Sequence, residues 1–505
     1  MSYIRVFIKK WIRQTNTHYY KMKHSLILFL LFFIVQFSFA QDTNQETVQR
    51  IDTYLDSIRN DEARLRQFFA KLPKGADLHH HYSGSVYAET YLEYIEKNNL
   101  WINRNSYAVA YDQAPRNERS EWSTVNSLKE DGYWSDIKVK IIESWSKLYF
   151  NYVSKANDEH FFSTFDRFSI PAKETYNEGL REIKNRAISE NVSYIETMFK
   201  STGFYDKFEK DNEFTTQLLA LQETKNDSIQ IKLAELYTYY TKVENAVFLS
   251  KVKSHNQLIQ KLHTENEIDD DKFTMRYQNY FIRLFDPATT FKSFLIAFHS
   301  ASTSDLIVGV NIVAPENNAV SMRDYWLHMQ IFKYFKSVYP TVKTAMHAGE
   351  LTLGLVKPED LTYHINDAVF IAGAKRIGHG VDIAYEKKSE ELLSYMAQHE
   401  IAIEISFSSN DFILGVSGNK HPILLYKAYN VPIVISTDDA GVLRTDLTQQ
   451  FLILTRDYPS INYQDIKKMV FNSINYSFLT QSEKEKIRKD LEVRFLEFEV
   501  GFVGE

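Results

Sequence analysis

The sequence contains no cysteine among its 505 residues. Disulfide bonds, thiolate metal ligands and cysteine nucleophiles are therefore excluded, and so is a lipid attached to an N-terminal cysteine. Glycine and proline are also scarce, with 16 and 10 residues, and no segment rich in them forms a linker between domains. Any metal site in this chain must consequently use nitrogen and oxygen ligands.

Acidic side chains are absent from the first 40 residues, which carry six basic ones. An almost unbroken apolar run of about 16 residues leads from Ser25 to Ala40 and is shorter than the ~20 residues that span a bilayer. Ser38 and Ala40 are small residues at the −3 and −1 positions of a cleavage site, which predicts a signal peptide over residues 1–40. We expect a secreted or periplasmic protein with no stable membrane anchor after cleavage; an uncleaved N-terminal anchor is the alternative.

Charge and composition narrow the class of partner. The chain is 44% hydrophobic and 25% charged, which is typical of a globular protein, and its 32 Tyr and 35 Phe indicate packing rather than disorder. The net charge is −6, and loss of the six N-terminal basic residues would take it to −12. An acidic surface argues against nucleic acid and anionic membranes as partners.

Short apolar strands alternate with helix-length segments after an N-terminal helical extension at 41–72. Strands are predicted at 75–81, 192–199, 278–285, 306–314, 343–348, 375–379, 401–407 and 431–437. Eight strands alternating with helices predict an α/β fold of the (β/α)₈ TIM-barrel type, with residues 73–505 forming the barrel domain.

Two intervals between predicted strands are too long for a single crossover helix, and a further segment follows the last strand. Residues of about 95–190 are predicted to form a helical insertion with loops, either a dimerisation element of a homodimer or a lid over the pocket. Residues 200–275 are predicted to form long helices, and 460–499 two closing helices.

The first chemical motif is Asp77-Leu78-His79-His80-His81, at the end of the first predicted strand. Residues i and i+2 of a strand share a face, so His79 and His81 should point into the barrel while His80 points outward. Two imidazoles on one strand face form half of a metal site, whereas a surface run of histidines is the alternative.

Three further motifs follow at the ends of later strands, where barrel enzymes build their sites. His347 with Glu350 three residues later suits a metal-activated water and its proton carrier. His379 lies between two glycines, a pattern that alone also fits a structural loop. Asp438 and Asp439 are adjacent carboxylates after a buried strand, costly there unless paired or metal-bound, although a helix-capping pair is the alternative.

Taken together, three histidines and one aspartate form an all-nitrogen and oxygen ligand set at matching places in the fold. This set, His79, His81, His347 and Asp438, suits one Zn²⁺ per chain, with other divalent ions as alternatives.

The order of these motifs resembles the adenosine deaminase family within the metal-dependent amidohydrolases. The family pattern runs His-x-His, His-Ala-Gly-Glu, Gly-His-Gly and Asp-Asp, and stands here as His79-His80-His81, His347-Ala348-Gly349-Glu350, Gly378-His379-Gly380 and Asp438-Asp439. The lead-in Leu72-Pro73-Lys74-Gly75, the signal peptide and the long insertion resemble the secreted branch of adenosine deaminase-related growth factors.

The resemblance implies a hydrolytic deaminase that converts adenosine, and 2′-deoxyadenosine, to inosine and ammonia through attack of a zinc-activated water at purine C6. It implies that Glu350 gives a proton to N1 and that His379 orients the water and helps to deprotonate it. It further implies that Asp439 contacts N7, and that the four ligands named above bind zinc.

Two departures from the family concern the substrate. Ser83 stands where the family often has an acidic residue for the ribose 5′-hydroxyl, and Ala314 stands where a glycine would meet the N3 side of the purine. A deaminase of adenine or of another modified purine is therefore an alternative, and a catalytically inactive extracellular binding protein is a further one. A deaminase of the cytidine type is excluded, because its zinc site needs cysteine.

Three other histidines, His328, His364 and His421, are expected to be surface or packing residues. The segment Ser406-Phe407-Ser408-Ser409-Asn410 lies at the seventh strand end, where it would line the site, and is given no catalytic role.

Overall fold

The computed structural model describes residues 45–112, 119–151 and 156–504. Eight parallel strands form one sheet in the order β1-β5-β6-β7-β8-β9-β10-β11. The strands are β1 (Lys74–His81), β5 (Val192–Ser201), β6 (Thr274–Ile282), β7 (Ile307–Val313), β8 (Lys343–Ala348), β9 (Arg376–His379), β10 (Ala402–Ile405) and β11 (Ile433–Ile435). The predicted (β/α)₈ barrel is confirmed.

A backbone bridge closes the barrel between its first and last strands. His80 pairs with Asp438, the Asp438 N–H donates to the His79 carbonyl at 2.8 Å, and the His81 N–H donates to the Asp438 carbonyl at 3.1 Å. This bridge brings the first and last chemical motifs of the sequence side by side.

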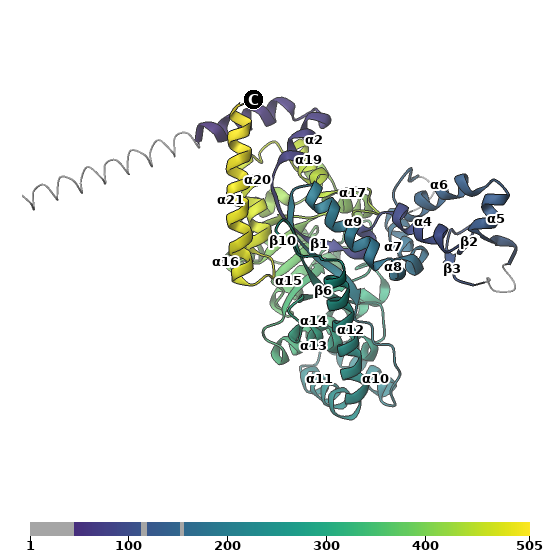
Figure 1. The fold of residues 1–505 in the computed structure, drawn as a ribbon. Coiled ribbons are helices and arrows are strands. Elements are labelled where there is room, and N and C mark those ends of the chain that lie inside the picture. Colours follow the sequence, from purple (N-terminus) through teal and green to yellow (C-terminus); the bar gives the residue numbers. More distant parts are fainter. Residues whose placement is uncertain (1–44, 113–118, 152–155, 505) are drawn as a thin grey trace, which may run out of the picture.

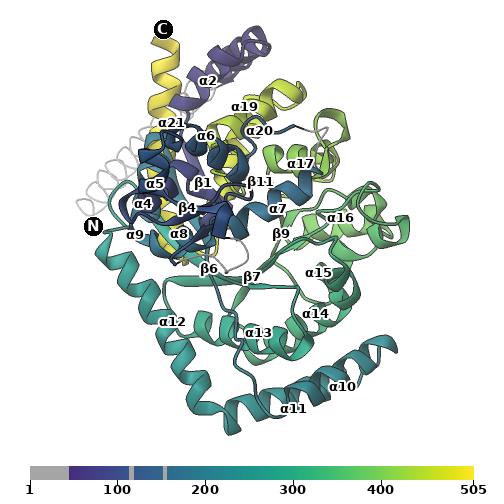
Figure 2. The same cartoon turned by 90° about the vertical axis from the view of Figure 1, so that its right-hand side faces the viewer.

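Helices surround the barrel, in the seven crossovers between its strands and after β11 (Figure 2). They are α9 (Tyr176–Ser189), α10 (Asp211–Glu223), α11 (Ile229–Thr238), the π-helical turn η2 (Tyr239–Val243), α12 (Asn245–Glu265), α13 (Pro287–Ser302), α14 (Ala319–Val338), α15 (His364–Phe370), α16 (Ser389–Gln398), α17 (Phe407–Leu414), α18 (Ile423–Ala428), α19 (Leu447–Asp457), α20 (Tyr463–Asn475) and α21 (Gln481–Gly504). The long helices expected at 200–275 and the two closing helices expected at 460–499 are thereby observed. Local signals set several starts: Asp286 caps α13 ahead of Pro287, and α20 begins with a capping box.

The N-terminal extension packs against the C-terminal helix (Figure 1). Residues 45–58 are helical and α2 (Glu62–Lys71) follows, capped by the Asp61 side chain. The Phe68 ring meets the Phe498 ring of α21 edge-on at 5.3 Å, and Phe69 stacks on Phe451 of α19 at 6.1 Å. The predicted signal peptide lies outside the described residues. Among the residues that the structure describes, no helix is long and apolar enough to cross a membrane.

The insertion between β1 and β5 extends to one side of the barrel (Figure 1). It contains α4 (Ala88–Lys97), α5 (Val125–Glu130), α6 (Trp134–Trp145), α7 (Asn157–Arg167), α8 (Ser169–Glu174) and a small antiparallel sheet of β2 (Trp101–Asn103), β3 (Val109–Ala110) and β4 (Trp122–Thr124). The prediction of helices and loops missed this sheet, because strands of two or three residues are too short to show a period.

Candidate active site

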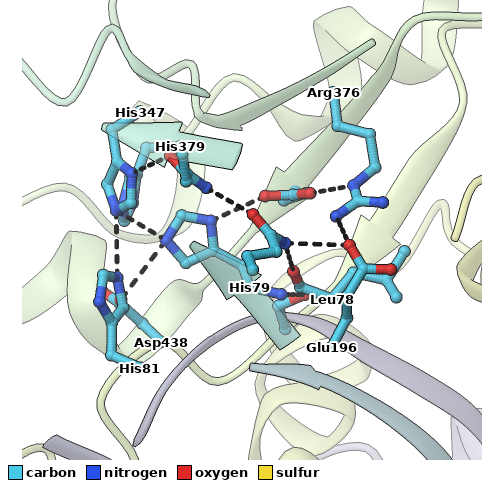
Figure 3. Close-up of polar contacts among 12 residues, drawn as sticks. Leu78, His79, His81, Glu196, His347, Arg376, His379 and Asp438 are labelled. Carbon is cyan, nitrogen blue, oxygen red and sulfur yellow. Dashed lines mark hydrogen bonds and ion pairs between the residues drawn. The ribbon is translucent and has the colours of Figure 1, made fainter. Parts of the chain in front are cut away.

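The four predicted metal ligands converge at the carboxyl ends of β1, β8 and β11. Nε2 of His347 lies 3.0 Å from Nε2 of His79 and 3.1 Å from Nε2 of His81. Oδ1 of Asp438 lies 3.5 Å from Nε2 of His79 and 3.2 Å from Nε2 of His81. Figure 3 shows the four side chains pointing toward one another.

These separations fit a metal ion held by four ligands. Ligand atoms at tetrahedral corners around Zn²⁺ are about 3.3 Å apart when each bond is about 2.0–2.1 Å long. The observed separations of 3.0 to 3.5 Å agree with that geometry. Three imidazole nitrogens in mutual contact have too few hydrogens to bond to one another in the neutral form, whereas all three lone pairs can bind one cation.

Three motif residues adopt a left-handed backbone conformation, which directs the neighbouring side chains of the site toward one another. His379 and Asp438 have φ of 68° and 66°, which non-glycine residues adopt at a cost, and Gly349 has φ of 77°. The two strained residues belong to the site itself, which is where such strain is usually retained.

A chain of charged side chains supports His79 from beneath. Its Nδ1 donates to Oε2 of Glu404 at 2.8 Å, and Arg376 forms ion pairs with Glu404 and with Glu196. All of these side chains are fully buried, and Figure 3 labels His79, Arg376 and Glu196 among them. Burial opposes charge on Glu404, but the Arg376 guanidinium lowers the pKa of that carboxyl below its ordinary value. This carboxylate fixes the tautomer of His79 and leaves Nε2 free for a metal.

His347 is oriented in the same manner by an amide. Its Nδ1 donates to Oδ1 of Asn311 at 3.0 Å, and that oxygen also accepts the Ile312 N–H at 2.8 Å. The amide nitrogen of Asn311 donates to Gln278 at 3.1 Å. Sequence reasoning missed both supporting residues, Glu404 and Asn311, because only the fold brings them to the motifs.

Glu350 lies beside the metal group, with one carboxyl oxygen 3.6 Å from Nε2 of His379. Its own backbone N–H donates to Oε2 of Glu316 at 2.8 Å, and the Gly349 N–H donates to the other oxygen at 3.2 Å. Burial, with the negative charges of Asp438 and Glu316, raises the pKa of Glu350 well above its ordinary value. Glu350 is thus suited to hold a proton near neutral pH.

Asp439 is the second carboxyl of its motif and points into the same space. Burial and the charge of Asp438 raise its pKa well above the ordinary value. Its Oδ1 has no hydrogen-bond partner within the protein. A Cβ at position 84 would lie 1.7 Å from this oxygen, so Gly84 is required for the close approach. A carboxyl whose pKa is raised, and which has one oxygen without a protein partner, is suited to donate to a ligand atom.

The site opens into a cavity of about 960 Å³, whose lining includes His81, His347, Glu350, His379, Asp438 and Asp439. Ser83 and Ala314 line it as well, and Ala314 has φ of 88°. Side chains of α7 and α8 form part of the wall, so the insertion contributes to the pocket. The lining also includes several aromatic side chains, among them Phe161, Phe165, Phe199, Phe204, Tyr205 and Tyr280.

His80 is buried, and so are the three histidines expected at the surface or in packing, His328, His364 and His421. His80 points away from the metal group and contacts the Thr197 hydroxyl at 2.9 Å. His364 donates to Glu316 at 2.5 Å, and His421 contacts Oδ1 of Asn410 at 3.0 Å. His364 therefore lies behind Glu350, and His421 behind His379. Both are packing residues in the interior, and neither lies at the surface.

Comparisons with known proteins agree with this geometry. Residues 282–493 match the family model for adenosine deaminase. The adenosine deaminase of Clostridium kluyveri is 33% identical over 146 residues, which are 29% of this chain and 38% of that protein. The adenosine deaminase of Plasmodium gallinaceum is 29% identical over 172 residues, which are 33% of this chain and 45% of that protein. The chain thus spans less than half the length of these relatives.

Solved structures extend the likeness of fold to most of the chain. The N6-mAMP deaminase of Arabidopsis superposes with a TM-score of 0.54 at 17% identity, covering 85% of this chain and 99% of that one. An amidohydrolase of Burkholderia ambifaria, solved with bound Zn, gives 0.52 at 15% identity, covering 87% and 95%. The family model thus matches the C-terminal part of the barrel, and the solved structures share the barrel fold over most of the chain.

Proposed function

We propose that this chain is a zinc-dependent deaminase that hydrolyses adenosine, and 2′-deoxyadenosine, to inosine or deoxyinosine and ammonia. The observation that carries the proposal is the placement of Glu350 and Asp439 beside four convergent metal ligands in one buried pocket. A metal group alone fits many hydrolases, but two carboxyls that favour protonation fit a purine ring, whose nitrogens accept hydrogen bonds.

His79, His81, His347 and Asp438 would hold the zinc ion. When bound there, the ion supplies Lewis acidity that makes a water nucleophilic near neutral pH. The donor set of three imidazoles and one carboxylate is one that zinc prefers, and its ligand atoms already have the separations described above.

Glu350 is proposed to give its proton to purine N1 as the nucleophile adds to C6. Addition moves electrons from the C6–N1 bond onto N1, so a proton supplied there stabilises the developing charge. The acid must hold its proton until the substrate binds, and the raised pKa of Glu350 meets that requirement.

Asp439 is proposed to recognise N7 of the base. Because N7 carries a lone pair and no hydrogen, its partner must be a donor, and a carboxyl donates only when it is protonated. The raised pKa of Asp439 and its unpartnered Oδ1 are consistent with that state. Ser83 and Ala314 line the pocket at the positions proposed for the ribose 5′-hydroxyl and the N3 side.

A second candidate substrate is a purine nucleoside 5′-monophosphate. Lys173 and Lys200 line the same cavity, and neither forms an ion pair with a carboxylate among the described residues, although the Lys200 ammonium lies 5.8 Å from the centroid of the Tyr176 ring. Burial, and then the charge of Lys173, lowers the pKa of Lys200. An unpaired, half-buried ammonium favours an anionic ligand, and Ser83 leaves no carboxylate at this position to repel a phosphate. The related Arabidopsis deaminase has been solved with IMP and with GMP.

Zinc content and turnover of adenosine by the purified protein test the proposal, with Glu350→Gln as the variant. We expect about one zinc per chain, release of inosine by the wild type, and a loss of roughly 10²-fold or more in the variant with zinc retained. AMP in place of adenosine decides between the two substrates. Zinc without turnover of any 6-aminopurine would contradict the function, and the absence of zinc would contradict the metal site.

We further propose that the protein is exported and belongs to the secreted branch of adenosine deaminase-related growth factors. The basic and apolar segments of residues 1–40 support export. N-terminal sequencing of protein recovered from the periplasm or the medium tests this proposal. An N-terminus at Gln41 is the expected result, and a chain retained in the membrane with its first residues intact would contradict it.

A further inference from the structure

His379 differs from the neighbouring zinc-site histidines in the partner of its Nδ1 atom. Nδ1 of His79 faces a carboxylate and Nδ1 of His347 faces an amide oxygen, so both rings donate from Nδ1. Nδ1 of His379 instead lies 3.0 Å from Nδ2 of Asn410, the amide nitrogen. An amide nitrogen donates and does not accept, so Nδ1 of His379 must be the acceptor.

The orientation of the Asn410 amide follows from a backbone group that cannot be reversed. The Ile423 N–H donates to Nδ1 of His421 at 3.2 Å. A neutral His421 must then carry its hydrogen on Nε2, which lies 3.0 Å from Oδ1 of Asn410. The Asn410 oxygen is thereby occupied as an acceptor, and its nitrogen is left to face His379.

Burial enforces this orientation of the Asn410 amide. His379, Asn410 and His421 are 1%, 0% and 4% exposed. A reversed amide would place its own N–H donors against the Nε2–H donor of His421, with little access of water to relieve the mismatch. A buried mismatch of this kind costs on the order of 1–3 kcal/mol. Burial also lowers the pKa of His421 to about 3, which keeps that ring neutral at neutral pH.

We propose that this relay holds His379 as the neutral tautomer with its hydrogen on Nε2, so that His379 donates a hydrogen bond to the attacking water and Glu350 alone moves the protons. Asn410 and His421 are then positioning residues. The inference rests on the proposed deamination. It keeps the orienting part of the role that the family resemblance implies for His379 and removes the deprotonating part, since Nε2 has no free lone pair. Protonation of the whole ring is disfavoured as well, because it would set an Nδ1–H against the Asn410 amide hydrogens.

The protons balance without His379. Glu350 gives its proton to N1 while the water oxygen bonds to C6, and the carboxylate takes the first proton from that oxygen. Glu350 passes this proton to the 6-amino group, the C6–N bond breaks with its electron pair on nitrogen, and ammonia leaves. Glu350 then takes the second O–H proton as C6=O forms. One water supplies both hydrogens, and Glu350 ends protonated as it began.

The variant Asn410→Asp tests the relay, because the carboxylate has the same shape but only accepts. It forces the hydrogen of His379 onto Nδ1 and leaves a lone pair on Nε2. If His379 is a donor, kcat falls roughly ten-fold or more while KM stays within about three-fold and zinc is retained. If His379 is a base, the new carboxylate strengthens it, so kcat equal to or above wild type overturns the proposal. Asn472→Asp is the matched control, since Asn472 is also buried and donates to the Ile433 carbonyl away from the site.

A spectroscopic readout separates this inference from the proposed function. In ¹⁵N-histidine-labelled, zinc-loaded enzyme, the His379 signal is identified by its loss in His379→Gln. We expect a protonated Nε2 and an unprotonated Nδ1 in the wild type, and the reverse in Asn410→Asp. A wild-type ring protonated at Nδ1 overturns the relay even in an active enzyme. A protein with the expected tautomer and no turnover of any 6-aminopurine keeps the relay and contradicts the proposed function.

Discussion

The carboxylate of Glu316 holds the backbone of Glu350, with 2.8 Å between Oε2 of the first and the N–H of the second. The other oxygen of Glu316 accepts from the Gly349 N–H and from His364. His364 is in turn stacked on Tyr325, with ring centroids 3.7 Å apart. The turn that presents the proposed proton donor is therefore fixed by three donors converging on one buried carboxylate, and not by the turn sequence alone.

Glu316→Gln should lower kcat roughly ten-fold with KM nearly unchanged. A glutamine has one acceptor oxygen and one donor nitrogen, so at least one of the three donors loses its partner and the turn loosens. Steady-state kinetics and zinc analysis provide the measurement, with Glu391→Gln on the exposed side of α16 as control. An unchanged kcat would show that the turn holds Glu350 without Glu316.

Glu404→Gln should weaken zinc binding by about 10- to 100-fold, the usual effect of removing a carboxylate behind a histidine ligand. The neutral side chain still accepts from His79 but no longer makes its Nε2 more basic, and it no longer neutralises Arg376. Chelator competition measures the dissociation constant, and excess zinc should restore turnover. Glu499→Gln, at a buried carboxylate far from the metal group, should leave the constant unchanged. Wild-type affinity in Glu404→Gln would contradict the supporting role.

The eight strands were predictable because each is a short apolar run that ends at a motif or a turn. β6 begins at Thr274, four residues before the prediction, because Arg276 faces outward and pairs there with Asp269 and Glu483. That charge interrupts the apolar run in the sequence but costs little in the fold. The predicted end at 285 was also too late, since β6 ends at Ile282.

The residues of the proposed site were predictable for a similar reason: the motifs place reactive side chains at strand ends, where a barrel assembles them. The residues that support these side chains were not predictable from the sequence. Glu404 stands 325 positions from His79, and Asn410 stands 31 positions from His379, so no local spacing links either pair. Glu404 reads in the sequence as one polar residue in an apolar strand, which is the only local sign of its role.

Ala314→Gly should lower KM for adenosine by roughly three- to ten-fold. Ala314 adopts φ of 88°, where a Cβ is strained by about 1–3 kcal/mol, and it lines the cavity on the side proposed for N3. Glycine removes the strain and lets the base approach the backbone, while its greater freedom in the unfolded chain offsets about 0.5–1 kcal/mol of the gain. Asn430→Gly, at an exposed left-handed residue with φ of 59°, is the control for the backbone effect alone. A KM that does not change would remove Ala314 from the substrate contacts.

The stability of the protein should fall as the pH is lowered from about 6.5 to about 4, in part because of His328. Burial lowers the pKa of His328 from 6.5 to about 4. Between these values the unfolded chain binds a proton at this residue and the folded chain does not, so acid favours unfolding, and the stabilisation present above pH 6.5 is lost. At about 1.4 kcal/mol per pKa unit, the single residue accounts for at most about 3 kcal/mol.

The variant His328→Gln isolates this contribution, because glutamine does not titrate. Urea unfolding of wild type and variant at several pH values should give a difference in unfolding free energy that shifts in favour of the variant as the pH falls to 4. Loss of metal at low pH acts on both proteins, so it cancels in the difference. His399→Gln, at an exposed histidine, should follow the wild type throughout. A difference that stays constant from pH 7 to pH 4 would mean that His328 titrates alike in the folded and the unfolded chain, and that acid destabilises the barrel through other groups.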